Sequence, residues 1–166
     1  MDEQFKKFNM KKFLDNLKNT YGKNITFDEK LSKYSWFNLG GPAEIFFKPA
    51  NIQQLSLFIK QLRDRKQPIN ILGAGSNTLI RDGGIKGATI KLGPQFSYMN
   101  ILKDNIIQFG AATLDITASN YAAKNSLSGI EFLSCIPGSI GGAIKMNSGC
   151  YGYEISKILD SLEVMD

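Results

Sequence analysis

The sequence predicts an α+β protein in which a small parallel βαβ lobe precedes a more antiparallel lobe. The apolar residues of AEIFFKP (43–49) and INIL (69–72) flank a stretch of helical periodicity, which is the order of a βαβ unit with parallel strands. Two later apolar runs, 98–102 and 106–109, flank three polar residues, which is typical of an antiparallel hairpin. Each half also contains a glycine cluster, so each lobe is expected to contribute one phosphate-binding loop.

An N-terminal helical segment, residues 1–30, is expected to dock on these lobes. Apolar residues recur at roughly helical spacing between Asp2 and Tyr21, and they define a docking face made of Phe5, Phe8, Phe13, Leu14, Leu17 and Tyr21. The opposite, solvated face then carries the lysines of this stretch, namely Lys6, Lys7, Lys11, Lys12 and Lys18.

The first lobe is expected over residues 31–94. Its first strand stops at Pro49, and Asn51 is the predicted N-cap of a helix whose apolar face comprises Leu55, Phe58, Ile59 and Leu62. That helix ends near Pro68, and a strand over 69–72 follows it. A glycine cluster begins at the carboxyl end of this strand, where open α/β sheets place their ligands.

The second lobe is expected over residues 95–166, after a strand over 88–92. Its predicted elements are, in order, a hairpin joined through Lys103–Asn105, a helix over Leu114–Lys124 with Leu114, Ala118, Tyr121 and Ala122 on one face, a short helix over Gly138–Met146 that opens toward a ligand, and a strand over Ser161–Met165.

The glycine-rich segment GIEFLSCIPGSIGGAIKMNSGCYG (129–152) is unusual because it is also apolar and almost uncharged. Glycine costs roughly 1 kcal/mol against alanine in a helix interior, so such a segment predicts backbone that lies close against something bulky. That neighbour is either a ligand or the protein's own core, and the segment alone leaves both interpretations open.

A second glycine cluster, LGAGSNT (72–78), points to phosphate. A short strand that runs into glycines and small polar residues presents successive backbone N–H groups, which form an anion-binding concavity called a nest. Two familiar phosphate motifs do not fit. Thr78 replaces the third glycine of G-x-G-x-x-G, and the string G-x-x-x-x-G-K-[ST] does not occur in the sequence.

Composition excludes several kinds of chemistry. The 166-residue chain has no histidine, which excludes Ser-His-Asp and Cys-His catalysis and the usual His-containing zinc sites. Its two cysteines match neither a disulfide framework nor a metal pattern, so no metal site is expected. No apolar run approaches the ~20 residues that span a bilayer, and no signal peptide is visible, so no membrane partner is expected and the cytoplasm is the expected location.

The net charge of +5 at pH 7 invites a nucleic-acid interpretation. The lysines are scattered, however, and the sequence has no base-stacking aromatic motif, so no nucleic-acid partner is expected. A diffuse positive field equally suits an anionic small molecule.

Four strings occur in order along the chain: WFNLGGPA (36–43), LGAGSNTL (72–79), GIEFLSCIPGSIGG (129–142) and MNSGCYG (146–152). Together they closely resemble the flavin-dependent UDP-N-acetylenolpyruvoylglucosamine reductases (UDP-N-acetylmuramate dehydrogenases) of peptidoglycan synthesis. The resemblance extends from about Leu31 to Asp166. It implies an FAD-binding domain of the p-cresol methylhydroxylase type, in which two α+β lobes hold FAD between them.

The resemblance also implies which residues hold the cofactor. The FAD diphosphate would be bound by Gly73, Ala74, Gly75, Ser76 and Asn77. The diphosphate and the flavin would be lined by Pro137, Gly138, Ser139, Gly141, Gly142, Asn147, Gly149 and Tyr151. Because the chain has no histidine and neither cysteine lies in a recognised attachment motif, FAD is expected to be bound non-covalently.

The activity that the resemblance implies is the reduction of UDP-N-acetylglucosamine enolpyruvate to UDP-N-acetylmuramate. In the family, FAD takes a hydride from NADPH and passes it to the enolpyruvyl double bond, and a serine, an arginine and a glutamate act on the substrate. Those three groups and the substrate-binding domain would lie beyond Asp166. No catalytic residue is therefore expected within this chain, and binding of the UDP-sugar is expected only when the missing part completes it.

Three alternatives accompany this interpretation. They are a catalytically inactive remnant that binds FAD only, the N-terminal half of a split enzyme that a complementary chain completes, and a flavin-binding fragment of another oxidoreductase of the same superfamily. Cys135 and Cys150 stand where the family commonly has glycine and alanine, and Ser148 stands where it commonly has alanine. Gly40–Pro42 is more simply a tight turn before a strand than a flavin contact.

Overall fold

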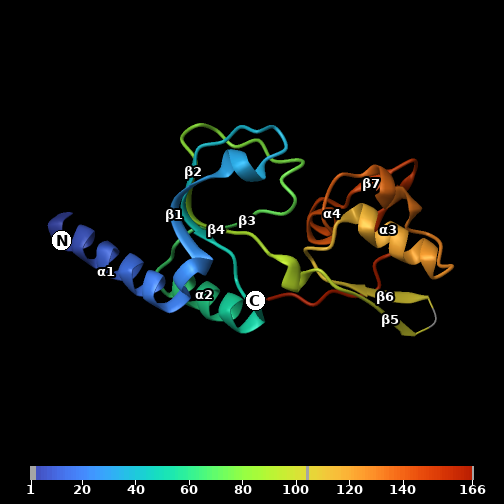
Figure 1. Ribbon diagram of the computed structural model, residues 1–166, viewed down its shortest axis with the longest axis horizontal. Coiled ribbons are helices and arrows are strands. Elements are labelled where there is room, and N and C mark those ends of the chain that lie inside the picture. The colour runs from blue at the N-terminus through green and yellow to red at the C-terminus, as the bar shows by residue number, and fades with distance from the viewer. Residues whose placement is uncertain (1–2, 104, 166) are drawn as a thin grey trace.

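Two lobes lie side by side in the computed structural model, which describes residues 3–103 and 105–165 (Figure 1). The first lobe contains α1 (Glu3–Tyr21), β1 (Ile25–Lys30), β2 (Pro42–Phe47), α2 (Ile52–Asp64), β3 (Ile69–Ile71) and β4 (Ile85–Ile90). The second contains β5 (Met99–Lys103), β6 (Ile106–Phe109), α3 (Asp115–Lys124), α4 (Ile140–Met146), β7 (Gly149–Cys150) and β8 (Tyr153–Glu154). The lobe boundaries drawn at 30/31 and 94/95 stay predictions.

Four residues that the sequence analysis assigned to segments lie outside the described residues. They are Met1 and Asp2 of the N-terminal segment, Asp104 of the hairpin turn and Asp166 at the end of the second lobe. Within the described residues, no helix is both long enough and apolar enough to cross a bilayer.

The first lobe is built on a mixed sheet of four strands in the order β1-β2-β4-β3. β1 runs antiparallel to β2, while β2 and β3 each pair in parallel with β4. The βαβ unit therefore exists, but β4 lies between the two strands that were expected to pair directly. β4 takes the central place because Ala88, Thr89 and Ile90 are all buried, whereas β3 is only three residues long and leaves Ile71 exposed.

β1 is a strand that the sequence analysis did not predict. Its sequence, ITFDEK, ends in three charged residues of kinds that are depleted in strands, and Asp28 has a left-handed φ of 54°. The strand forms because β2 offers a partner, with Ile25 opposite Phe47 and Lys30 opposite Pro42. Pairing with a buried neighbour outweighs the local propensity here.

The core of the first lobe lies between the sheet, α2 and the C-terminal half of α1. The ring centroids of Phe47 and Phe58 are 4.1 Å apart, and the ring of Tyr21 lies edge-on at 4.8 Å from Phe47. Asn51 caps α2 as predicted, since its Oδ1 accepts a hydrogen bond of 2.9 Å from the N–H of Gln54. The cap and the buried rings together fix α2 against the sheet.

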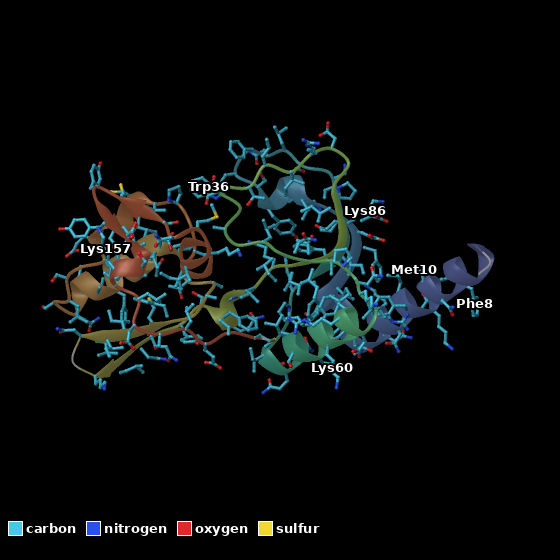
Figure 2. All side chains as sticks on the ribbon, turned by 180° about the vertical axis from the view of Figure 1, so that it is seen from behind. Phe8, Met10, Trp36, Lys60, Lys86 and Lys157 are labelled. Carbon is cyan, nitrogen blue, oxygen red and sulfur yellow. The ribbon has the colours of Figure 1, made fainter. Side chains whose placement is uncertain are left out.

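Only part of the predicted docking face of α1 is used. Phe13, Leu17 and Tyr21 are buried against the body of the protein. Phe8, in contrast, is 65% exposed, and the first half of the helix projects away from both lobes (Figures 1 and 2). Phe5 lies outside the described side chains.

The second lobe combines two hairpins with two helices. β5 and β6 form an antiparallel pair, which confirms the predicted hairpin, and β7 and β8 form another. Its core is smaller than that of the first lobe and is made of Ala118, Phe132, Leu133, Ile140, Ala143 and Ile155. Of the predicted apolar face of α3, Ala118 and Ala122 are buried, while Leu114 precedes the helix and is half-exposed.

The strand predicted over Ser161–Met165 is wrong. This segment is irregular, and it runs from the second lobe back to the first, where Met165 packs against the core (Figure 1). Leu162 and Val164 remain exposed. Alternating apolar residues form a strand only where a neighbouring strand accepts their backbone hydrogen bonds, and among the described strands none pairs with this segment.

Candidate functional site

The two glycine-rich segments meet across the boundary between the lobes. Residues 73–77 follow β3 of the first lobe, and residues 137–142 lead into α4 of the second (Figure 1). The Ser76 hydroxyl donates a hydrogen bond to the carbonyl of Pro137. A Cβ placed on Gly73 would lie 3.0 Å from Oγ of Ser139, so the backbone of Gly73 lies close to the Ser139 side chain. The tertiary structure therefore joins two clusters that are about 60 residues apart in the sequence.

Backbone N–H groups without acceptors gather at this junction. Within the described residues, no N–H group from 73–77 donates a hydrogen bond to a protein acceptor, and the same holds for Gly138, Ser139 and Gly142. Polar backbone groups in folded proteins are nearly always paired, so a concentration of free donors indicates a place for an acceptor. Successive free N–H groups are the feature that binds phosphate in a nest.

The conformation of the first segment depends on Gly75. This residue is buried, its φ is +75°, and a Cβ in its place would collide with the carbonyl of Tyr34. Its own carbonyl accepts a hydrogen bond of 3.0 Å from the N–H of Trp36. Figure 2 shows Trp36 on the side of the first lobe that faces the second. Only glycine satisfies both the positive φ and the close approach.

The second segment is held by hydrogen bonds to the loop that precedes α3. The N–H groups of Ile140 and Gly141 donate to the carbonyls of Thr113 and Ala111, both at 2.9 Å. In return, the carbonyl of Gly138 accepts a bond of 3.2 Å from the N–H of Asp115. Both segments are thus positioned by the protein itself, which lowers the entropic cost of binding a ligand.

The third string, MNSGCYG, lies at the opposite end of α4. Asn147 terminates this helix with a left-handed φ of 46°, and its Oδ1 accepts a hydrogen bond of 2.9 Å from the N–H of Ser156. Gly149 belongs to β7, and Tyr151 occupies the β7–β8 turn with 83% of its side chain exposed. The structure brings together ten of the thirteen predicted residues, and the flavin contacts of Asn147, Gly149 and Tyr151 stay a prediction.

Asp115 is a feature of the site region that the sequence analysis missed. Its carboxyl group is fully buried, and within the described residues neither oxygen has a hydrogen-bond partner. A Cβ placed on Gly138 would collide with Oδ2 of Asp115, so the carboxyl lies directly against the second glycine segment. Burial raises the pKa of Asp115 to about 6. An aspartate in the first turn of a helix is ordinary in sequence, and only the tertiary packing makes this one unusual.

Lys91 is a second residue that the sequence analysis missed. It follows β4, and its Nζ donates a hydrogen bond of 2.5 Å to the carbonyl of Gly73. Burial lowers the pKa of Lys91, and the nearby charge of Lys48 lowers it further. A lysine at the end of an apolar strand, as in ATIKL, is the signal that could have identified it.

Two further expectations concern residues around the site. Cys135 is exposed, Cys150 is half-buried, and both are free thiols. Within the described part of the chain, no cluster of side chains could hold a metal ion.

Gly41 packs so tightly on the loop at Asp82 that a Cβ would collide with the Asp82 carbonyl, and β2 begins at the next residue. Close backbone packing before a strand explains this glycine.

Comparisons with known proteins show which family the chain resembles. Residues 43–166 match the FAD binding domain family. The UDP-N-acetylenolpyruvoylglucosamine reductase of Pelagibacter ubique (strain HTCC1062) is 46% identical over 148 residues, which cover 89% of this chain and 49% of that protein. The reductase of Orientia tsutsugamushi (strain Boryong) is 45% identical over 156 residues, which cover 92% and 50%.

A solved structure gives the same result for the fold. The crystal structure of UDP-N-acetylenolpyruvylglucosamine reductase from Thermus caldophilus has a TM-score of 0.61 and 32% sequence identity, covering 78% of this chain and 44% of that one. The α+β fold of an FAD-binding domain, expected from the sequence, is thereby confirmed, and its strands form a mixed sheet and small antiparallel sheets. The chain spans about half the length of the curated relatives it matches. It belongs to the UDP-N-acetylenolpyruvoylglucosamine reductase family, of which it represents the N-terminal, FAD-binding part.

Proposed function

We propose that this chain binds FAD non-covalently, with the diphosphate between residues 73–77 and residues 137–142. The observation that carries the proposal is the set of backbone N–H groups on both segments that have no acceptor among the described residues. These donors suit two adjacent phosphates, because each lobe offers several of them at one place. The absence of histidine and the positions of the two cysteines favour non-covalent attachment.

The residues of this site bind and orient; they do not carry out chemistry. Gly75 holds the backbone conformation that aims its neighbours' N–H groups, and Ser76 joins the two lobes through the Pro137 carbonyl. Gly73 and Gly138 carry no side chain that could block a phosphate from reaching the backbone. FAD, when bound, supplies the hydride-transfer chemistry that none of these residues provides.

We further propose that the chain is the FAD-binding part of an enzyme that reduces UDP-N-acetylglucosamine enolpyruvate with NADPH in the cytoplasm. Support comes from relatives that carry the name UDP-N-acetylenolpyruvoylglucosamine reductase and are about twice as long as the matched region. The arginine, serine and glutamate expected from the resemblance would come from outside this chain, either from the rest of the protein or from a complementary chain. An FAD-binding remnant without activity is the competing interpretation.

The experiment that tests FAD binding is a visible absorption spectrum of the purified chain after incubation with FAD and desalting. We expect the flavin bands to be retained. The Ser76→Ala variant should retain less flavin, because it loses the hydrogen bond between the lobes. A chain that is folded by circular dichroism but retains no flavin would contradict the proposal.

A second step separates the enzyme from the remnant. The flavin-loaded chain is mixed with NADPH and the enolpyruvyl substrate, alone and with a separately expressed C-terminal half taken from the Pelagibacter relative. Substrate reduction only in the presence of the second chain would support the enzyme. Flavin binding with no reduction under either condition would support the remnant.

A further inference from the structure

A pocket of about 360 Å³ lies at the boundary between the lobes, beside the glycine segments. Lys48, Lys91 and Gly93 line it from the first lobe, and Ser97 and Ala112 line it from the second lobe. None of the thirteen predicted cofactor residues is among its lining residues. Its volume is within the range of ligand pockets, roughly 300–1,000 Å³.

Two like charges stand next to each other in this pocket. In the parallel pair of β2 and β4, Phe47 lies opposite Ile90, and the N–H of Lys91 donates a bond of 2.9 Å to the Phe47 carbonyl. Lys48 and Lys91 directly follow these partners, so the two lysines stand side by side where β2 and β4 leave the sheet. Like charges opposite each other on neighbouring strands are unfavourable, and the charge of Lys48 adds to burial in lowering the pKa of Lys91.

No described carboxylate neutralises this pair. Lys48 Nζ donates a hydrogen bond of 3.2 Å to the hydroxyl of Tyr34 and lies 4.7 Å from the centroid of its ring. Lys91 Nζ donates to the carbonyl of Gly73. The nearest acid along this chain of contacts is Glu29, which accepts from Tyr34 at 3.2 Å and already pairs with Lys33 at 3.1 Å. Within the described side chains, neither ammonium group of the pocket is within 4.0 Å of a carboxylate.

Uncharged donors complete the surroundings. Within the described residues, the N–H of Gly93 and the hydroxyl of Ser97 make no hydrogen bond to the protein. The pocket borders both segments of the proposed cofactor site. Lys91, which lines it, donates a hydrogen bond to the Gly73 carbonyl, and Ala112, which also lines it, follows Ala111, whose carbonyl accepts from the N–H of Gly141. Two cations, a hydroxyl and a backbone N–H around one cavity are the donor set of a phosphate site.

We propose that the Lys48–Lys91 pocket binds a phosphoryl group of a nucleotide. The source is either the diphosphate of FAD or a phosphate of the nicotinamide nucleotide, and the shared chemistry is a phosphate monoester or diester that neutralises both lysines. The choice of these two sources rests on the proposed function, whereas the anion site itself rests on the pocket alone.

The test measures the rate at which acetic anhydride acylates each lysine of the wild-type chain, read by mass spectrometry. The rates are compared without ligand and with riboflavin, FAD, NADPH added to the flavin-loaded chain, or inorganic phosphate. We expect FAD or NADPH to slow acylation of Lys48 and Lys91 several-fold, and riboflavin, which has no phosphate, to leave both unchanged. Lys60 on α2 (Figure 2) lies outside the pocket and serves as the internal control.

A variant series gives an independent reading. Lys48→Gln should lower the affinity for the nucleotide that protects the lysines by about tenfold, which is the effect of losing one charge-assisted hydrogen bond. It should also reduce the salt dependence of binding. Lys48→Arg should restore most of the affinity, because it keeps the charge. Lys60→Gln makes the same change in net charge and should leave the affinity as it is in wild type.

The outcomes separate this proposal from the proposed function. Protection by FAD assigns the site to the cofactor diphosphate, and protection by NADPH alone assigns it to the second nucleotide; both support the proposal. If phosphate protects the lysines while FAD is not retained, the pocket stands and FAD binding fails. If FAD is retained while Lys48 and Lys91 react at unchanged rates with every probe, the pocket proposal is overturned and FAD binding stands.

Discussion

The two lobes of this protein hold their halves of the site by different means. The first lobe has a large core in which Phe47, Phe58, Leu17 and Ile90 are fully buried between one sheet and two helices. The second has a small core and two-stranded sheets, which are marginal as independent structures. The first glycine segment therefore extends from a well-packed platform, whereas the second is held mainly by backbone hydrogen bonds to residues 111–115.

This difference follows from what glycine can do. A glycine segment has no side chains to bury, so it is fixed either by enclosure or by hydrogen bonds. Gly75 is enclosed against Tyr34, and the segment of Gly141 is bonded to the loop before α3. Three experiments, in order of expected effect, test the comparison.

The largest effect is expected for Phe58→Ala in the core of the first lobe. Phe58 is fully buried and packs on Phe47 with ring centroids 4.1 Å apart. Removing the ring leaves a cavity that should lower the free energy of unfolding by about 3–5 kcal/mol, measured by urea denaturation. Leu57→Ala, on the exposed side of the same helix, should change it by less than about 0.5 kcal/mol. Equal losses in the two variants would contradict a packed platform.

The second effect is a pH dependence that comes from Asp115. Its folded pKa of about 6 lies above its ordinary value of 3.8, so the folded state keeps the proton to higher pH than the unfolded state. Stability from this group is therefore greatest below pH ~4 and falls as pH rises to ~6, by roughly 3 kcal/mol in total. Asp115→Asn removes this component, because an amide does not titrate in that range.

The measurement is the free energy of unfolding of wild type and Asp115→Asn at intervals between pH 4 and pH 7. We expect the wild type to lose stability relative to the variant across this interval. Asp160→Asn, at an exposed position, is the matched control and should follow the wild-type curve. Parallel curves for wild type and Asp115→Asn would show that the buried carboxyl has an unshifted pKa in the folded protein.

The third effect contrasts one glycine from each lobe. Gly75→Ala must adopt a positive φ and collide with the Tyr34 carbonyl, so it should lower stability by about 1–2 kcal/mol and reduce FAD retention. Gly142→Ala meets only Oγ of Ser139, at 3.5 Å, and lies within α4. It should raise the stability of the ligand-free chain by up to about 1 kcal/mol while reducing FAD retention.

Thermal unfolding of the ligand-free chain and FAD retention after desalting measure the two quantities separately. We expect stability to fall in Gly75→Ala and to rise in Gly142→Ala, while FAD retention falls in both variants. If Gly142→Ala binds FAD as wild type does, Gly142 does not contact the diphosphate. The second segment would then be a structural turn, which is the interpretation that its sequence left open.

The sequence by itself determined those elements whose signals are local. The cap at Asn51, the apolar face of α2 and the hairpin of β5 and β6 were predicted correctly, because capping, helical periodicity and short polar turns act over a few residues. The two glycine clusters were also identified from the sequence, since glycine among apolar residues is unusual. The local patterns did not imply that the two clusters meet. The hydrogen bond from Ser76 to Pro137, which only the folded structure shows, brings them together.

The tertiary structure alone decided the features that depend on distant partners. β4 lies between β2 and β3, β1 forms although its last three residues disfavour strands, and the segment over 161–165 does not form one. Strand pairing is a contact between remote residues, and a single chain pattern does not record which partner is available. Asp115 and the Lys48–Lys91 pocket have the same origin. Burial and the proximity of like charges arise only when the chain has folded.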